Sequence, residues 1–282
     1  MAVVRPVSPS IAQCEVTHIE RQPIDADRAR AEHAGYVAAL EALGAEVITL
    51  DGAEALPDSV FVEDALLDLG DVRILTNPGA PSRRPERDSV RAAFAPGGPL
   101  AAHGPLVEMP EGLHLDGGDV LRVRGVVFVG RSTRTSPEAI AWLRTVTSAP
   151  VVPVEVRGAL HLKTAVTAAT ENVLVLDPDA VDRDAFRFID VVMVPPGEEA
   201  AANVLRVPPR RARCTPDDRD ERVLAPAGCP RTVAALRRWG VQVTEVPMPE
   251  LAKAEAGLTC MSVLLGADFA PAPPDLSPRR SS

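Results

Sequence analysis

Aromatic residues, paired cysteines and long apolar runs are all scarce in this chain of 282 residues. Aromatic side chains make up only 3% of it, which leaves few surfaces on which nucleic-acid bases could stack. The formal net charge is -9, and an acidic chain repels both nucleic acid and anionic lipid. No apolar run approaches the length that spans a bilayer. We therefore expect neither nucleic acid nor a membrane as a partner.

The four cysteines are too scattered to form a recognisable metal or redox site. They are Cys14, Cys214, Cys229 and Cys260, and no two of them have C-x-x-C spacing. A chain of this length buries enough apolar surface to fold without disulfides. The N-terminal sequence MAVVRPVSPS has no basic stretch followed by a long apolar run, so no signal peptide is evident. We expect reduced thiols and a cytoplasmic location.

The chain does contain a repeated order of strands and helices. A strand is predicted at Ala2–Val4, and Asp25 is a suitable N-cap for a helix that runs through Leu43 and stops at Gly44. A further strand is predicted at Ala45–Leu50. The first part of the chain therefore follows a strand–helix–strand order.

Pairs of apolar runs separated by turn residues predict hairpins in the rest of the chain. The pairs are FVEDALLDL with DVRILT, DVLRV with VVFVG, TAVTAA with NVLVL, and NVLRV with RVLAP across a polar loop near Arg210–Asp220, and CMSVLLG closes the series. Helical stretches lie between them, near Glu86–Phe94, Pro137–Val146, Asp182–Phe186 and Arg231–Trp239. About five hairpin–helix–strand units result, which predicts α/β modules arranged around an axis. An ordinary mixed α/β sheet fits the same periodicity.

No internal linker divides the chain into two parts. We expect residues 1–270 to form a single domain. Residues 271–282 are rich in proline and serine, and we expect them to be a disordered tail.

Cys260 and His161 are the first candidates for chemistry. Cys260 lies in GLTCMSVLL before an apolar strand, where a thiol can face a pocket and act as a nucleophile once its thiolate is stabilised. His161 lies in ALHLKTAVT at the start of a β-run, and histidine is the usual proton shuttle near neutral pH. Both residue types are often purely structural when buried. Four other histidines compete for the same role: His18, His33, His103 and His114.

Acidic residues stand beside glycines or inside apolar runs. Asp116 precedes two glycines in HLDGGDVL, where a carboxylate could be aimed inward and fix the tautomer of an imidazole. Glu63 and Asp64 lie in an apolar run with Asp58 upstream, and buried acids need a cation such as a guanidinium. Neighbouring strand residues point to opposite faces, so both acids reach one ligand only if the strand ends or bulges there. An ordinary D-G-G-D turn and solvated acids are the simpler interpretations.

Two arginines stand where they could bind a carboxylate. Arg83 follows a proline-rich loop, and Arg134 follows a predicted strand in GRSTRTS. The guanidinium fork suits carboxylate recognition, although solvated surface arginines are the usual case. No G-x-G-x-x-G, Walker loop, H-E-x-x-H or G-x-S-x-G motif is present, so these common templates fail.

Taken together, these segments resemble the dimethylarginine dimethylaminohydrolase family of the guanidino-modifying (amidinotransferase) superfamily. The matching strings are LPDSVFVEDALL, ILTNPGAPSRRPE, HLDGGDVL, FVGRSTRTS, LHLKTAV, AANVL, PAGCPRT and GLTCMSVLL. They occur in the family's order and run from about Glu32 to Leu265. The resemblance implies an α/β fold of the pentein type, a β/α propeller of five modules with a pseudo-five-fold arrangement and the active site on its axis.

The resemblance also implies roles for individual residues. Cys260 resembles the family's nucleophile and His161 its proton donor, while Asp116 matches the acid that orients the histidine. Glu63 and Asp64 match the pair that binds the substrate guanidinium.

Four further positions match the family's contacts with the amino-acid end of the substrate. Asp58 matches an acid that we assign to the α-amino group, and Arg83 and Arg134 match the residues that hold the α-carboxylate. Ala254 falls where the family supplies a backbone contact. The chain departs from the family at Glu255-Ala256, where Asp-Gly is usual, and in two other places: the poorly aligned loop Ser8–His18, and Asn77.

The resemblance implies hydrolysis of asymmetric dimethylarginine and monomethylarginine to citrulline plus dimethylamine or methylamine, through a Cys-linked thiouronium. It implies a small arginine-like molecule as the partner and no cofactor or metal, and it leaves pairing into a homodimer open. Alternatives are an arginine deiminase-like hydrolase of another guanidino substrate and a non-catalytic guanidino-binding protein. A zinc protein that uses Cys260, His161 and an acid is a further alternative, although we expect any such zinc to be inhibitory.

Overall fold

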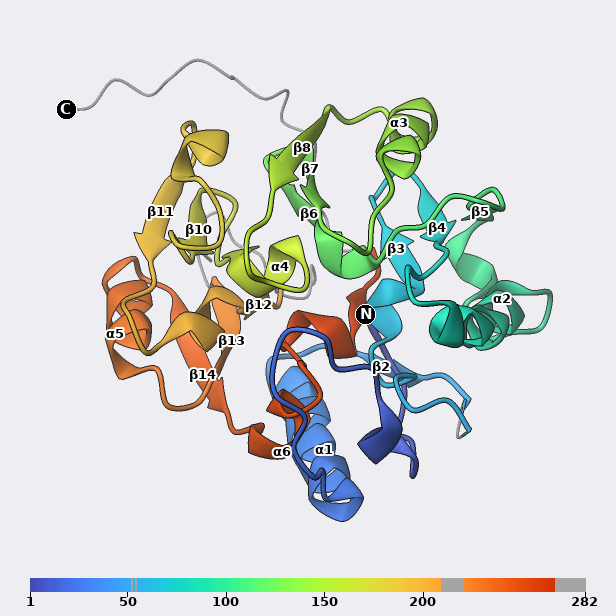
Figure 1. The fold of residues 1–282 in the computed structure, drawn as a ribbon, viewed down its shortest axis with the longest axis horizontal. Coiled ribbons are helices and arrows are strands. Elements are labelled where there is room, and N and C mark those ends of the chain that lie inside the picture. The colour runs from blue at the N-terminus through green and yellow to red at the C-terminus, as the bar shows by residue number, and fades with distance from the viewer. Residues whose placement is uncertain (52, 54, 209–220, 267–282) are drawn as a thin grey trace.

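The computed structural model describes residues 1–51, 53, 55–208 and 221–266. Within these residues the chain forms five separate three-stranded sheets, and Figure 1 shows them arranged around a common centre. In each sheet the middle strand pairs antiparallel with one neighbour and parallel with the other. This mixed α/β chain has a propeller-like layout that fits the five predicted modules. The five sheets do not join into a closed barrel.

The strands are short, and each sheet contains three of them. In sheet order they are β15 (Val263–Leu264), β1 (Ala2–Val4) and β2 (Val47–Thr49); β3 (Leu66–Asp68), β4 (Arg73–Leu75) and β5 (Leu106–Glu108); β6 (Val120–Val123), β7 (Val126–Arg131) and β8 (Val151–Glu155); β9 (Val166–Ala168), β10 (Val173–Leu176) and β11 (Asp190–Met193); and β12 (Leu205–Arg206), β13 (Arg222–Pro226) and β14 (Gln242–Val246).

Helices connect the second and third strands of the modules and lie toward the outside in Figure 1, whereas α4 lies near the centre. The α-helices are α1 (Ala26–Ala42), α2 (Arg87–Phe94), α3 (Pro137–Val146), α4 (Leu162–Ala165), α5 (Pro230–Arg238) and α6 (Pro249–Ala252). The described 3₁₀-helices are η1 (Ile11–Gln13), η2 (Val62–Asp64), η3 (Pro81–Glu86), η4 (Ala101–His103), η5 (Gly117–Asp119), η6 (Arg183–Phe186), η7 (Glu199–Ala202) and η9 (Thr259–Met261).

The first sheet joins segments from the two ends of the described chain. β1 pairs antiparallel with β15, so that Ala2 lies opposite Leu264, and it pairs parallel with β2. In the other four sheets the antiparallel pair is made by consecutive strands. The β15–β1 pair therefore takes the place of a hairpin and completes the ring.

The middle strands are mostly apolar because each one separates two hydrophobic cores. Val126 and Phe128 of β7 pack in the core shared with the β9–β11 sheet, whereas Val127 and Val129 pack in the core shared with the β3–β5 sheet. Successive strand residues point to opposite faces, so a strand buried on both faces needs an unbroken apolar run. Five such cores lie between neighbouring sheets.

Most predicted elements are confirmed. The Asp25 side chain accepts hydrogen bonds from the first amides of α1, and Gly44 follows the helix with a φ of 88°. The β6–β7 turn has positive φ at Arg124 and Gly125, which is the geometry of a type I′ hairpin. No helix among the described residues combines the length and the apolar character needed to cross a bilayer.

One predicted element differs in type. Phe61–Ala65, read as the start of a strand, contains the 3₁₀-helix η2, and β3 begins only at Leu66. The helical stretch predicted near Asp182–Phe186 is present as the 3₁₀-helix η6. The polar loop near Arg210–Asp220, which contains Cys214, and the tail 271–282 lie outside the described residues.

Candidate active site

A small pocket brings together seven of the nine predicted site residues. They are Asp58, Asp64, Arg83, Arg134, His161, Ala254 and Cys260. The pocket has a volume of about 20 Å³. That is roughly the space needed by one water molecule, so the pocket is closed as it stands. The remaining two residues do not line it: Asp116 is hydrogen-bonded to His161 of the pocket, and Glu63 lines another pocket.

His161 and Asp116 form a buried hydrogen-bonded pair. Nε2 of His161 lies 2.9 Å from Oδ2 of Asp116, and Oδ1 of Asp116 accepts a hydrogen bond from the Gly79 amide at 2.7 Å. Burial by itself lowers the pKa of His161, but the charge of Asp64 and the hydrogen bond to Asp116 outweigh it and raise the pKa to about 9. The imidazole is therefore protonated at neutral pH and can donate a proton.

The two glycines after Asp116 serve close approach rather than a tight turn. Neither has a positive φ, and Gly118 donates its amide to Asp64 Oδ1 at 3.0 Å. A Cβ on Gly118 would lie 2.6 Å from Nδ1 of His161, and one on Gly117 would lie 2.0 Å from the backbone oxygen of Glu63. Any larger residue would push these groups apart.

Cys260 lies in η9, directly before β15. Asn203 holds this helix, since its Oδ1 accepts from the Thr259 amide and its Nδ2 donates to the Thr259 hydroxyl, both at 3.1 Å. Burial, with the nearby carboxylates of Glu63 and Asp64, raises the pKa of Cys260 to about 12. The thiol is therefore neutral at pH 7, and a cation that offsets these carboxylates would favour the thiolate.

The 3₁₀-helix η2 separates the two neighbouring acids. Asp64 accepts from Nη1 of Arg83 at 2.6 Å, and although burial opposes ionisation, this cation lowers the pKa of Asp64 to about 2. Glu63 turns to the other side, where Lys163 donates to its Oε1, and it lines a second pocket. Burial raises the pKa of Glu63 to about 7 despite the ammonium of Lys163. Neither acid lies in a strand, because β3 begins only at Leu66.

The two predicted carboxylate-binding arginines have different surroundings. Arg83 is held by Glu86, with Nε and Nη2 2.9 and 3.0 Å from its two carboxylate oxygens, and Nη2 also donates to the Phe61 carbonyl at 3.1 Å. The guanidinium of Arg134 is buried in the pocket wall and has no hydrogen-bond or ion-pair partner in the described part of the chain. Of the two, Arg134 is therefore the cation with its donors free for a ligand.

A segment from Glu15 to Ile19 covers one side of the pocket. The Glu15 amide donates to both carboxylate oxygens of Asp58, at 3.2 and 3.1 Å. At the other end, the Glu255 carboxylate accepts from the consecutive amides of Thr17, His18 and Ile19. We call residues 15–19 the strap. All of it except Ile19 lies within the poorly aligned loop Ser8–His18.

Asp58 and Glu255, the two acids that bind the strap, each have an unusual property. Burial raises the pKa of Asp58 to about 6, although Arg83 opposes this effect. Glu255 adopts a φ of 57°, in the region that disfavours side chains other than glycine. The carboxylate at the Glu255-Ala256 departure is thus bound to the strap.

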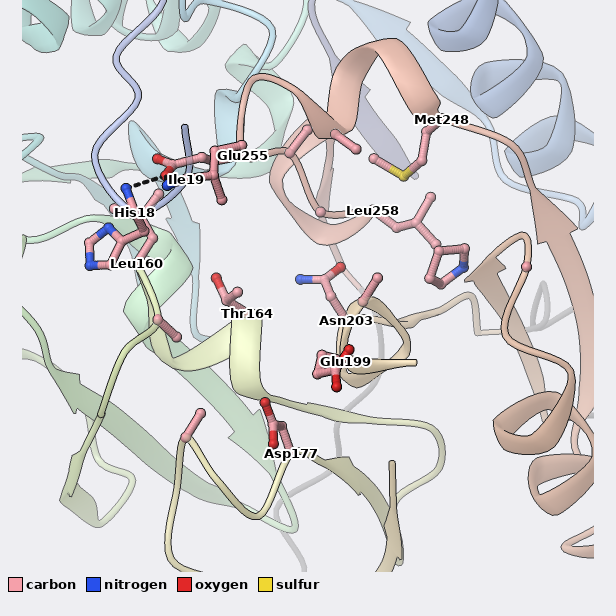
Figure 2. A pocket seen from close by; sticks show the side chains of 18 of the residues that line it. His18, Ile19, Leu160, Thr164, Asp177, Glu199, Asn203, Met248, Glu255 and Leu258 are labelled. Atoms are coloured by element: carbon pink, nitrogen blue, oxygen red, sulfur yellow. Dashed lines mark hydrogen bonds between the residues drawn. The ribbon is translucent and has the colours of Figure 1, made fainter. Parts of the chain in front are cut away.

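A much larger pocket of about 980 Å³ lies next to the small one and shares Leu160 and Glu255 with it. Figure 2 shows Glu255 on its rim, bonded to the strap, with Leu160 below the strap and with Thr164 and Asn203 across the cavity. The strap and Leu160 therefore separate the closed pocket from an open one.

Asp64, Asp116 and His161 place one ligand atom each within 4.8 Å of one another, as a metal site would. This set lacks the Cys260 of the zinc alternative. Both carboxylates already accept hydrogen bonds from the protein, from Arg83 and Gly118 in one case and from His161 and Gly79 in the other. The protein's own donors account for this cluster.

Several residues that support the site were given no role from the sequence, although some of them, such as Lys163 and Asn203, lie in strings that match the family. Lys163, Glu86, Asn203, Glu255 and Glu15 hold or cover the predicted residues. Most of their partners are far away in the chain, so no local spacing could reveal them.

Two further positions noted from the sequence are Asn77 and His114. Asn77, at a departure from the family pattern, donates to the carbonyls of Pro110 and Leu113 and so ties down the segment before His114. His114 is not among the residues that line the small pocket.

Comparison with known proteins agrees with this geometry. The family model described as N,N dimethylarginine dimethylhydrolase, eukaryotic, matches residues 13–191. The N(G),N(G)-dimethylarginine dimethylaminohydrolase of Streptomyces coelicolor is 36% identical over 94% of this chain and 96% of its own length.

Solved structures agree as well. The Pseudomonas aeruginosa enzyme, as a cysteine-to-serine mutant complexed with citrulline, has a TM-score of 0.80 at 29% identity over 93% of this chain and 97% of that one. A dimethylarginine dimethylaminohydrolase adduct with S-methyl-L-thiocitrulline has the same TM-score and identity, over 93% of this chain and 98% of that one. The chain therefore belongs to the dimethylarginine dimethylaminohydrolase family and is an amidine hydrolase.

Proposed function

We propose that this protein hydrolyses Nω-methylated arginine, namely asymmetric dimethylarginine and monomethylarginine, to citrulline and dimethylamine or methylamine. The observation that carries the proposal is one pocket in which a thiol, an imidazole paired with a carboxylate, and cation-binding acids converge. Relatives that bear the dimethylargininase name, and their complex with citrulline and adduct with S-methyl-L-thiocitrulline, support the same chemistry.

In this proposal the substrate is held at both ends. Arg134, with its free donors, and Arg83 bind the α-carboxylate, because guanidinium forks match carboxylates. Asp58 binds the α-amino group, and the backbone at Ala254 contributes a further contact. Asp64 and Glu63 bind the guanidinium nitrogens and align its central carbon.

The substrate cation also prepares the nucleophile. Its positive charge offsets Glu63 and Asp64, the two carboxylates that help to raise the pKa of Cys260. As this charge arrives, the Cys260 thiol loses its proton to solvent, and the thiolate sulfur bonds to the guanidinium carbon.

Acid–base catalysis by His161 completes the cycle. Its proton goes to the departing amine as the C–N bond breaks, which leaves a thiouronium on Cys260. The neutral imidazole then takes a proton from water, whose oxygen adds to the same carbon. The C–S bond breaks, and citrulline and the free thiol are released. Asp116 keeps the imidazole oriented throughout and supports its charged form.

The test is citrulline release from asymmetric dimethylarginine, monomethylarginine and arginine by the wild type, Cys260→Ser and Cys229→Ser. Cys229 is a matched control because it is a buried free cysteine that does not line the pocket. We expect turnover of the methylated substrates that Cys260→Ser abolishes and Cys229→Ser retains.

Other outcomes separate the alternatives. Faster turnover of arginine than of the methylated substrates would replace the proposal by a deiminase-like activity. If none of the three substrates is turned over but arginine still binds, the protein is a guanidino-binding protein instead.

A further inference from the structure

Lys163 is a buried cation that the proposed reaction does not use. It is one of only two lysines in the chain; the other is Lys253. The two positions leave 28 arginines among the 30 basic residues. Lys163 lies in α4, two residues after His161, and only 7% of its surface is exposed. Its ammonium donates to Oε1 of Glu63, its only ion-pair partner among the described residues.

Glu63 is left half satisfied by this contact. Oε1 accepts from Lys163, whereas Oε2 is buried and has no partner at hydrogen-bonding geometry in the described part of the chain; the nearby Thr259 hydroxyl helps to lower the pKa of the carboxyl group without completing such a bond. A buried carboxylate oxygen without a donor is unfavourable, and native proteins rarely keep one without a functional reason. The free oxygen is therefore an acceptor that awaits a donor.

The position of Glu63 indicates which donor that is. η2, which carries Glu63, packs against η9, which carries Cys260, and Glu63 is the charged group that most affects this thiol. A group attacked by the sulfur of Cys260 therefore comes close to Glu63. A guanidinium carries several N–H donors in one plane, and one of them can donate to the free Oε2.

The choice of lysine over arginine fits this reading. An ammonium is a point charge that can bind one carboxylate oxygen and leave the other free. An arginine fork tends to bind both oxygens of a carboxylate, as Arg83 does with Glu86. Lys253 contacts both oxygens of Glu250, whereas Lys163 contacts Oε1 of Glu63 alone, so the placement of Lys163 together with its single point of contact leaves Oε2 available.

We propose that Lys163 is a positioning residue for the hydrolysis, which fixes Oε1 of Glu63 and thereby presents the free, charged Oε2 to the substrate guanidinium. The inference rests on the proposed function. Burial already raises the pKa of Glu63 to about 7 with the ammonium in place. Without Lys163 the carboxyl group would be neutral at pH 7 and would lose its attraction for a cation.

The experiment compares KM and kcat for monomethylarginine in the wild type, Lys163→Met and Lys163→Arg. We expect Lys163→Met to raise KM by about tenfold or more, with a smaller effect on kcat, because the lost charge acts on guanidinium binding. Lys163→Arg keeps the charge, yet we expect it to raise KM as well, because its fork competes for Oε2. Lys253→Met is the matched control, since Lys253 pairs with Glu250 away from the pocket, and its KM should stay within twofold of the wild type.

A double-mutant cycle with Glu63→Gln distinguishes this role from a purely structural one. If Lys163 acts through Glu63, then Lys163→Met adds no further rise in KM in the Glu63→Gln background. Thermal unfolding of each variant checks that the fold is retained.

The outcomes are distinct. Any of three results would overturn this inference and leave the proposed function standing. They are wild-type turnover with an unchanged KM in Lys163→Met, a wild-type KM in Lys163→Arg, and effects of Lys163→Met and Glu63→Gln on KM that simply multiply. Absence of wild-type turnover would overturn both.

Discussion

At the scale of single residues, the thiol of Cys260 is held neutral by its surroundings. Burial and the charges of Glu63 and Asp64 raise its pKa to about 12. The thiolate fraction grows with pH, so we expect alkylation of Cys260 by iodoacetamide to rise roughly tenfold per pH unit between pH 7 and 10. Peptide mapping isolates Cys260 from the other cysteines, and the labelled peptide should vanish in Cys260→Ser. A rate that levels off below pH 9 would contradict the raised pKa.

Asp116 offers a second prediction at this scale. Replacing it by Asn keeps the shape of the side chain but removes the negative charge that supports the His161 imidazolium. We expect Asp116→Asn to lower kcat by about 10²–10⁴-fold, the usual contribution of general acid–base catalysis. The change should also lower the pKa of His161, seen as a shift of the alkaline limb of the pH–rate profile toward neutral pH. Unaltered kcat would exclude a supporting role for Asp116.

The residues that could be predicted from the sequence are those that stand in recognisable strings. Cys260, His161 and Asp116 lie in such strings, and the structure brings the first two to one pocket and places Asp116 in a hydrogen bond with His161. Lys163 shares the string LHLKTAV with His161, and Glu255 stands at a departure from the family pattern, but the sequence did not reveal the partners of either residue. Lys163 is 100 residues from Glu63, and Glu255 is 237 residues from His18, so their contacts arise only when distant modules meet.

At the scale of elements, the strap and the turn that carries Glu255 act together. Three consecutive amides of the strap end on one carboxylate, which holds the small pocket apart from the large one. We expect Glu255→Ala to release residues 17–19 and to speed their amide hydrogen exchange by about tenfold or more. KM for the substrate should rise in the same variant, because a loosened strap must be ordered again on binding.

Glu199→Ala is the matched control for this prediction. Glu199 is an exposed acid that lines the same large pocket, and its carboxylate accepts from the nearby Gly197 amide. Hydrogen exchange at residues 17–19 should match the wild type there. If exchange at residues 17–19 of the Glu255→Ala variant also equalled that of the wild type, the strap would be held by other contacts.

Elements were predicted correctly where the residue type determines the backbone conformation, and incorrectly where tertiary contacts determine it. The Arg124-Gly125 turn and the Asp25 cap follow from residue type, because glycine takes positive φ readily and aspartate accepts from helix amides. Phe61–Ala65 has the apolar pattern of a strand, yet it forms a 3₁₀ turn in which Asp64 bonds Arg83 and Glu63 bonds Lys163. These ion pairs override the local preference.

At the scale of the whole molecule, His33 makes stability depend on pH. It is buried on α1, its Nε2 has no hydrogen-bond partner in the described part of the chain, and burial lowers its pKa to about 4. Between pH 6.5 and 4 the unfolded chain binds a proton that the folded chain refuses, so this residue costs stability as pH falls. Relative to a variant that cannot titrate there, the loss is about 3 kcal/mol by pH 4.

Urea unfolding of the wild type and His33→Leu at pH 7 and pH 4.5 measures this effect. The free-energy difference between the two proteins should move in favour of His33→Leu by roughly 2–3 kcal/mol at the lower pH. The comparison at pH 7 supplies the baseline for packing changes. A difference that is the same at both values would mean that His33 is free to take up a proton in the folded state.

The five-module architecture was foreseeable because each module repeats the same order of apolar runs and turns. The two-sided burial of the middle strands explains why those runs are unbroken, as in Val126–Val129 of β7. The partner of β1 could not be foreseen, because β15 lies at the opposite end of the described chain.

The pairing of β1 with β15 has a consequence for how the enzyme is made. Cys260 stands three residues before β15, so the nucleophile is fixed in place only when the last described strand docks beside the first. During synthesis, β1 leaves the ribosome long before its antiparallel partner β15 is made. The edge of β1 therefore stays unpaired until more than 250 further residues have been added. Assembly of the catalytic centre is thus coupled to completion of the ring, and a chain interrupted before β15 would contain four of the five sheets without a working site.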